Sequence, residues 1–280
     1  MEATNHYVAQ PPQGVFTIAE PKETCPICKG YGWLQDDVPV GHPDFNRLFP
    51  CQCIQGQLEA NRLRRVHVAA GLPPDQQSMT FDNFVPGQAV RLDAPDQHDR
   101  STEASRIRVR IQKLRQNRTS LPDHLDRAKA RCLDFARQPQ GFLTLLGEAG
   151  CGKTHLASAI ANYRLARGQV TQFSVVPDLL DHLRATFKPD SGVSYDARFE
   201  AYKTTPLLIL DDLGTEHETS WASEKLYQLI NYRYNWHLPV VITSNELPTH
   251  LDLRLQSRLF DLRRNCVFEI LAGDYRMRGR

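Results

Sequence analysis

The sequence lacks several features that would assign a protein to a class at once. No apolar run is long enough to span a bilayer, so we expect no membrane partner. The first residues, Met1 to His6, have neither a basic start nor an apolar stretch, so no secretory signal is visible and a cytoplasmic location is the default expectation. We find no internal repeat, and the net charge of +2 is too small to exclude a partner class.

The composition, with 41% hydrophobic and 24% charged residues, is that of a globular protein. Its 280 residues suggest one ordinary domain with an accessory region, or two small domains. From Gly141 onward, apolar strands alternate with helices, which predicts an α/β fold with a mostly parallel sheet and helices on both faces. The expected strands are Phe142–Leu146, Val170–Val175, Leu207–Leu210, Val240–Thr243 and Val267–Leu271.

Helices are expected between these strands and before them. The expected spans are Gln55–Ala70, which Gly71 and the prolines after it should end, then Leu121–Arg137, Lys153–Arg167, a helix opened by Pro177, and Ser220–His237. Arginines near Arg64 and a basic run from Arg106 to Arg118 could contact phosphate or an acidic partner, although a solvated helix face explains each one equally well.

The seven cysteines are not expected to form a disulfide framework in a cytosolic chain. Cys25 and Cys28 form a C-x2-C pair, and Cys51 and Cys53 form a C-x-C pair. Four soft thiolates suit a closed tetrahedral zinc site, which is structural and not catalytic. His42 lies between the pairs and could replace one cysteine. Free thiols or a redox pair remain the alternative. A redox C-x-x-C is expected near a βαβ pattern, however, and the sequence around Cys25 and Cys28 has none.

A Walker A pattern for phosphate binding follows the first strand of the α/β region. Glycines let backbone N–H groups surround phosphate oxygens, and the helix that starts there points its positive end at the same phosphates. Lys153 is expected to bind the β- and γ-phosphates of ATP, and the Thr154 hydroxyl to ligate Mg²⁺. The residues expected to contact the nucleotide are Gly147, Glu148, Ala149, Gly150, Cys151, Gly152, Lys153, Thr154 and His155.

Polar residues after two later strands should complete this site, because ligands bind at the carboxyl ends of parallel strands. Asp211 is expected to hold Mg²⁺, and Asp212 to orient or deprotonate the attacking water. Asn245 could contact the γ-phosphate or the water, although a helix cap is a competing role. A further cation is needed for the transferring phosphoryl group, and either Arg254 or Arg258 could supply it, although either could instead be a solvated charge on a short helix.

Together these motifs resemble those of the DnaC/DnaI helicase loaders and the IstB transposition ATPases, a clade of AAA+ proteins related to the initiator DnaA. The likeness covers about half of the chain, residues 140–280. It lies in the P-loop ending Gly-Lys-Thr-His-Leu, in Leu207 to Gly214 with its Asp-Asp-Leu-Gly ending, in Thr243-Ser244-Asn245, in Arg254 to Leu259 and in Gly273-Asp274-Tyr275-Arg276.

This resemblance implies an AAA+ sheet with strand order 5-1-4-3-2 and ATP with Mg²⁺ at an interface between subunits of a self-oligomer. It implies Arg258 as a finger acting on a neighbouring subunit and Arg276 as a nucleotide-sensing residue. It also implies single-stranded DNA and a replicative DNA helicase as partners. Many AAA+ proteins have Glu where Asp212 stands, so slow, oligomer-dependent ATP hydrolysis is expected.

The resulting hypothesis is an ATP-dependent helicase loader. The alternatives are an IstB-like helper that recruits a transposase to DNA, and a zinc-stabilised adaptor that binds ATP without turnover. The expected domain organisation is a flexible tail (1–24), a zinc- and partner-binding region (25–75), a linker with helices (76–140) and the AAA+ ATPase domain (141–280).

Overall fold

The computed structural model describes residues 6–8, 25–84, 121–185, 195–214, 219–245 and 251–272. The chain divides into two compact units, Met1–Val66 and His67–Arg280. The boundary falls inside helix α1 (Gln52–Ala69), so we describe each unit by itself. No helix among the described residues has the length and apolar character needed to cross a membrane.

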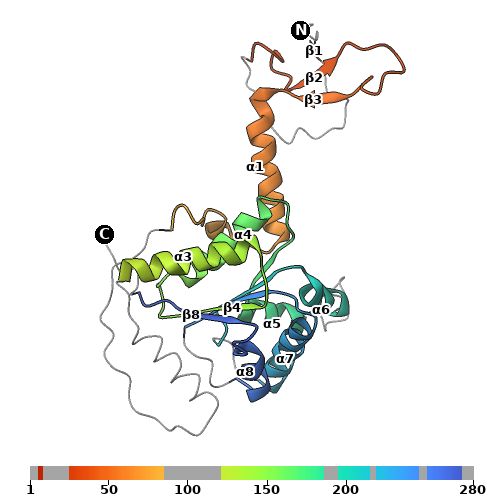
Figure 1. The fold of residues 1–280 in the computed structure, drawn as a ribbon. Coiled ribbons are helices and arrows are strands. Elements are labelled where there is room, and N and C mark those ends of the chain that lie inside the picture. Colours follow the sequence, from red (N-terminus) through yellow and green to blue (C-terminus); the bar gives the residue numbers. More distant parts are fainter. Residues whose placement is uncertain are drawn as a thin grey trace. The chain divides into compact units, whose positions relative to one another are not determined.

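The first unit contains a small antiparallel sheet (Figure 1). Its strands are β1 (His6–Val8), β2 (Trp33–Asp36) and β3 (Leu48–Pro50), with β2 in the middle. The first turns of α1 follow β3, and the helix begins three residues earlier than the predicted Gln55. Cys53 therefore lies in the first turn of the helix, beside the sheet, where the C-x-C spacing places it.

The second unit is a five-stranded parallel sheet in which every neighbouring pair is parallel. Its order is β5-β6-β7-β4-β8, which is the predicted 5-1-4-3-2 order read from the other edge. The strands are β4 (Phe142–Leu146), β5 (Gln172–Val175), β6 (Leu208–Asp211), β7 (Val240–Ser244) and β8 (Cys266–Glu269). The predicted α/β fold and strand order are thus confirmed.

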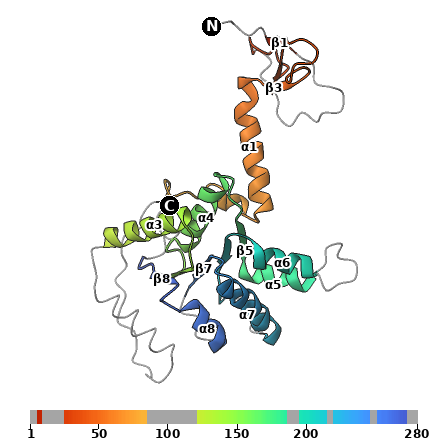
Figure 2. The same cartoon turned by 45° about the vertical axis from the view of Figure 1, so that its right-hand side comes forward.

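Helices cover both faces of this sheet (Figures 1 and 2). One face carries α3 (Leu121–Arg137) and α4 (Lys153–Leu165). On the other, alternate strand residues such as Leu208, Leu210 and Ile242 form a core with the apolar sides of the remaining helices. These are α5 (Val176–Ala185), α6 (Tyr195–Thr204), α7 (Ser220–Asn235) and α8 (Leu253–Leu259).

Several predicted boundaries shift by one to three residues. Val170, predicted as the start of the second strand, is 63% exposed and precedes β5. Strand β6 runs one residue further than predicted and so includes Asp211. The fifth strand starts and ends earlier than predicted, at Cys266 and Glu269. Apolar residues extend past the hydrogen-bonded ladder, some of them buried and some, like Val170, exposed, so apolar character alone misplaces strand ends.

Helix α1 ends as its sequence predicts. Gly71 adopts a φ of +74°, and the Leu72 N–H donates to the His67 carbonyl in the pattern typical of a glycine-terminated helix. A Cβ at Gly71 would lie 2.5 Å from the carbonyl oxygen of Phe173 on β5. Only glycine therefore allows both this turn and the close approach to the sheet edge.

Candidate nucleotide and metal sites

The phosphate loop connects the end of β4 to the start of α4. Gly147 has a φ of 150°, and a Cβ there would lie 2.5 Å from the Ile270 carbonyl oxygen. Gly152 is the N-cap of α4 with a φ of 101°, and a Cβ there would lie 2.8 Å from the Phe84 ring. The loop thus needs its glycines for backbone geometry, and it leads into a helix N-terminus that favours anions. This cradle fits a nucleotide phosphate.

Lys153 is 4% exposed, and its ammonium group is held by the loop and by one side chain from outside it. Its Nζ donates to the carbonyl oxygens of Gly147 and Glu148, both at 2.8 Å, and to Asn245 Oδ1 at 3.0 Å. The structure therefore brings Asn245, at the end of β7, to the phosphate loop. A bound phosphate oxygen would take the place of these carbonyl acceptors as a stronger, charged partner.

Asp211 and Thr154 bring hard oxygen donors together beside the loop. Thr154 Oγ1 donates to both carboxylate oxygens of Asp211 at 3.1 Å. Hydroxyl and carboxylate oxygens are ligands that Mg²⁺ prefers, and Mg²⁺ is typically bound by one or two such groups together with substrate phosphates. The donor set at the carboxyl edge of the sheet therefore fits this ion.

Burial raises the pKa of the Asp211 carboxyl from 3.8 to about 6, and the neighbouring Asp212 adds to the rise. Hydrogen bonds from Thr243 and Thr154 partly oppose it. A carboxylate that is costly to ionise in the nucleotide-free protein gains an opposing charge when a cation binds. The electrostatics of Asp211 thus favour cation binding above about pH 6.

Asp212 follows β6 in a left-handed backbone conformation, with a φ of 58°. Its backbone N–H donates to Thr243 Oγ1 at 2.9 Å. Non-glycine residues adopt this conformation at a cost, and such strain clusters at functional sites. The turn places Asp212 immediately after Asp211 at the nucleotide edge of the sheet.

The two candidate arginines lie on α8 and contact α7 within the same chain. Arg258 Nε donates to Asn231 Oδ1 at 3.1 Å. Arg254 is exposed, pairs with Asp252 at 2.7 Å and lies 4.3 Å from the centre of the Tyr227 ring. Among the described residues neither arginine contacts the phosphate loop of its own chain. Arg276 and the basic run Arg106–Arg118 lie outside the described residues.

His155, expected among the nucleotide contacts, engages a different part of the chain. Its Nε2 lies 2.9 Å from the Thr80 carbonyl oxygen, and its ring meets Phe84 edge-on at 5.3 Å. Further along α4, Asn162 Nδ2 donates to the carbonyl of Met79 at 2.6 Å. Residues 76–84, which the sequence assigns only to a linker, thus pack along α4 as far as the phosphate loop.

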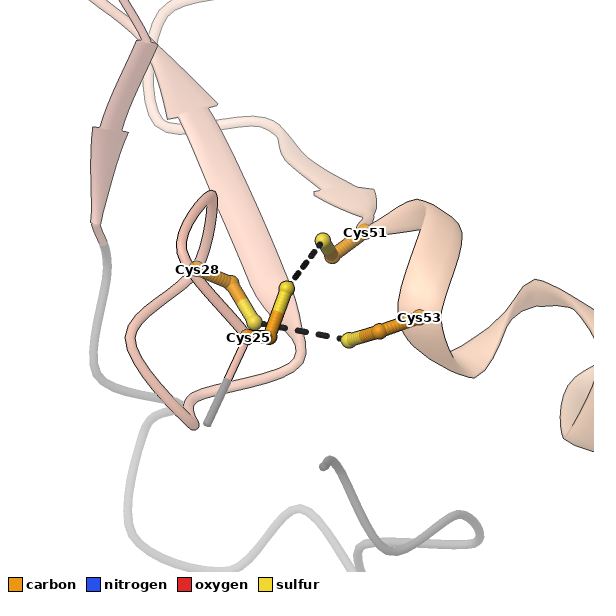
Figure 3. A group of neighbouring side chains, drawn as sticks. All are labelled: Cys25, Cys28, Cys51 and Cys53. Atoms are coloured by element: carbon orange, nitrogen blue, oxygen red, sulfur yellow. Dashed lines mark hydrogen bonds between the residues drawn. The ribbon is translucent and has the colours of Figure 1, made fainter. Parts of the chain in front are cut away.

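The four paired cysteines converge in the first unit. Figure 3 shows Cys25 and Cys28 on a loop facing Cys51 and Cys53 at the start of α1. Their sulfur atoms all lie within 4.8 Å of one another, with Cys25 Sγ 3.8 Å from Cys51 Sγ and Cys28 Sγ 3.5 Å from Cys53 Sγ. A tetrahedral zinc ion with Zn–S bonds of about 2.3 Å separates its sulfurs by about 3.8 Å. The cluster therefore fits a metal ion of this kind.

The electrostatics of Cys25 suit metal binding, whereas burial raises the pKa of the Cys51 thiol in the metal-free cluster. Backbone N–H groups of Cys28 and Ile27 lower the pKa of the Cys25 thiol to about 6. The Gly32 N–H donates to Cys28 Sγ at 3.2 Å. Donors of this kind stabilise thiolates, the form that binds metal. His42, the alternative fourth ligand, instead accepts a hydrogen bond from the Asp44 N–H and is not in the cluster.

Comparison with known proteins agrees with this geometry. DnaC from Escherichia coli, a replicative helicase loader, is 29% identical over 135 residues, which cover 47% of this chain and 55% of DnaC. A protein of insertion sequence IS5376 from Geobacillus stearothermophilus is 29% identical over 153 residues, which cover 52% of this chain and 59% of that protein. The chain thus spans little more than half the length of either relative.

A crystal structure described as a DNA replication initiation factor shares the fold. It has a TM-score of 0.50 and 18% identity, and the alignment covers 69% of this chain and 50% of that one. Residues 76–258 match the family described as IstB-like ATP binding protein. This match takes in the phosphate loop, both aspartates, Asn245 and Arg258. The chain therefore belongs to the family of IstB-like ATP binding proteins.

Proposed function

We propose that this protein is an ATP-dependent loader of a replicative DNA helicase that also binds single-stranded DNA. The observation that carries the proposal is the pairing of a P-loop unit with a separate four-cysteine unit in one chain. A loader must hold a partner while a nucleotide sets its state, and two compact units can divide these tasks. The similarity to DnaC supports this reading.

The residues of the site have distinct roles in this proposal. Lys153 leaves the carbonyls of its own loop to bind the β- and γ-phosphates, while the N-terminus of α4 binds the phosphate charge. Thr154 and Asp211 hold Mg²⁺, which neutralises charge on the phosphates when bound. Asp212 orients the attacking water, and Asn245, which contacts Lys153, reaches the γ-phosphate side.

The cation for the transferring phosphoryl group comes from a second copy of the chain. Arg258 lies on α8, held by Asn231 on α7, and acts on the nucleotide of its neighbour in a self-oligomer. A single chain then lacks one charge of the complete site and hydrolyses ATP slowly. Exposed arginines of α1, Arg62, Arg64 and Arg65, together with the basic run Arg106–Arg118, supply contacts to DNA phosphates.

Zinc is the metal we propose for the cysteine cluster, with all four thiolates as ligands. The Cys25→Ser, Cys28→Ser double variant should lose its bound zinc, because two ligands cannot close a tetrahedral site. The measurement is metal content per chain by mass spectrometry of the purified protein. Cys266→Ser, at a partly exposed cysteine of the second unit, is the matched control and should keep one zinc per chain. Equal zinc content in the two variants would refute the assignment.

The helicase partnership is tested by capture on an immobilised replicative helicase in the presence of ATP and Mg²⁺. We expect the wild-type chain to be retained and the Cys25→Ser, Cys28→Ser variant to be lost, because the first unit holds the helicase. Cys266→Ser should be retained as wild type is. A wild-type chain that binds ATP but not the helicase would contradict the loader proposal.

A second candidate function is that of a transposition helper, favoured by the match to the IS5376 protein. Such a helper assembles on double-stranded DNA with ATP and recruits a transposase. Filaments on duplex DNA with ATP, together with no capture by the helicase, would favour this candidate. An ATP-binding adaptor without turnover is distinguished by Asp212→Asn, which traps ATP in a hydrolysing protein and changes nothing in an adaptor.

A further inference from the structure

Thr243 connects the two aspartates of the nucleotide site through one buried side chain. It lies near the end of β7, is fully buried, and faces the end of β6, one position beyond the register pair Leu210–Ile242. Its Oγ1 donates to Asp211 Oδ1 at 2.6 Å and accepts from the Asp212 backbone N–H at 2.9 Å. The Thr243 hydroxyl therefore donates its proton to Asp211 and accepts a hydrogen bond from Asp212, two consecutive residues of the site.

The backbone of β7 adds a third contact to the same turn. The Leu213 N–H donates to the Thr243 carbonyl at 2.9 Å, just after Asp212 with its φ of 58°. Asp212 needs support in a conformation that side chains disfavour. Thr243 therefore holds the left-handed turn through the N–H groups of Asp212 and Leu213, and so fixes the position of the Asp212 Cα from which the side chain extends.

The hydrogen bond from Thr243 to Asp211 comes from a different part of the fold than the one from Thr154. Thr154 lies on α4 at the phosphate loop, whereas Thr243 approaches from the buried strand β7. A ligand that takes the Thr154 hydroxyl leaves the bond from Thr243 in place. Partners of this kind fix the orientation of a metal-binding carboxylate, and their loss typically costs 10–100-fold in metal affinity or activity.

We propose that Thr243 is a positioning residue for Mg²⁺-dependent ATP chemistry, which it serves by fixing the Asp211 carboxylate and the Asp212 backbone together. This inference rests on the proposed use of ATP and Mg²⁺ at the phosphate loop. Thr243 does not touch the nucleotide in this account. Its effect therefore falls on Mg²⁺ dependence and turnover, and not on nucleotide affinity without metal.

The test compares Thr243→Val, which keeps the shape and loses both hydrogen bonds, with Thr243→Ser, which keeps the hydroxyl. Binding of a fluorescent ATP analogue is titrated with Mg²⁺ and repeated in EDTA, and ATP turnover is measured alongside. For Thr243→Val we expect EDTA binding within about 2-fold of wild type, a 10–100-fold higher Mg²⁺ requirement and a similar fall in kcat, with KM changed much less. Thr243→Ser should show a Mg²⁺ requirement and a kcat close to those of wild type.

Thr144→Val is the matched control, because Thr144 is equally buried on the adjacent strand β4 and its hydroxyl has no partner among the described residues. It should behave as wild type. If Thr243→Val does not fold, Thr243→Ala carries the same comparison. Wild-type Mg²⁺ dependence in the valine or alanine variant, or a serine variant as impaired as either, overturns the inference alone. A wild-type chain that binds no ATP overturns the proposed function as well.

Discussion

Replacing Lys153 with alanine should lower the affinity for ATP by at least about 100-fold, which corresponds to about 2.7 kcal/mol. The ammonium group is the one cation within the loop, and the carbonyls of Gly147 and Glu148 already bind it without a ligand. Charge-assisted bonds to phosphate are stronger than these bonds to neutral carbonyls. Titration of the folded variant with a fluorescent ATP analogue measures the loss.

The same substitution should cost little stability. The carbonyls of Gly147 and Glu148 lie in a partly exposed loop, so water can replace the lost donor. Arg167→Ala removes a cation just beyond the opposite end of α4 and should leave ATP affinity unchanged. Unaltered affinity in Lys153→Ala, with a thermal unfolding curve like that of wild type, would show that the loop does not bind the phosphates.

Asp211→Asn should have opposite effects on function and on stability. Removing the carboxylate should abolish the effect of Mg²⁺ on ATP binding and turnover. Because burial raises the pKa of Asp211 to about 6, its ionisation opposes folding above that pH. We therefore expect the nucleotide-free variant to be more stable than wild type at pH 8 by about 1–3 kcal/mol, since one pKa unit corresponds to about 1.4 kcal/mol.

The pH dependence fixes the sign of this prediction. The unfavourable ionisation is absent below the ordinary pKa of 3.8, grows as pH rises from there, and is complete above about 6. The stability gain should therefore be large at pH 8 and mostly lost at pH 4.5, when unfolding is followed in EDTA. An equal gain at both pH values would contradict the proposed cause.

Asp261→Asn supplies a control of opposite sign. Hydrogen bonds from Tyr234 and Arg263 lower the pKa of Asp261, so its ionised form favours folding. That stability is present above the ordinary pKa of a carboxyl and is lost as pH falls. Asp261→Asn should therefore be less stable than wild type at pH 8, with a smaller difference at low pH.

The sequence predicts much of the framework of the nucleotide site. An apolar strand, a glycine-rich loop and a helix follow one another from Phe142 to Leu165, and local residue types alone mark them. Asp211 and Asp212 could be assigned because the carboxyl ends of parallel strands meet at one edge. The strand order came from the resemblance, since local pattern does not determine which strands are neighbours.

What the sequence does not reveal depends on contacts between distant residues. Thr243 stands in the Thr243-Ser244-Asn245 motif, but the sequence does not show that its hydroxyl bridges two aspartates while that of Thr144 has no partner among the described residues. Arg233 is fully buried and donates to four backbone carbonyls, whereas helix periodicity in α7 gives no sign of this. His155 follows the P-loop lysine and threonine, yet it turns to the Thr80 carbonyl. Such partners are set by packing across the fold and not by spacing.

A structure of the protein with a non-hydrolysable ATP analogue and Mg²⁺ tests the central claim most directly. The account predicts phosphates at the N-terminus of α4, with Lys153 released from the Gly147 and Glu148 carbonyls and bound to phosphate oxygens. It also predicts Mg²⁺ beside Thr154 and Asp211. A nucleotide bound elsewhere, or one bound while Lys153 keeps both carbonyl contacts, would contradict it.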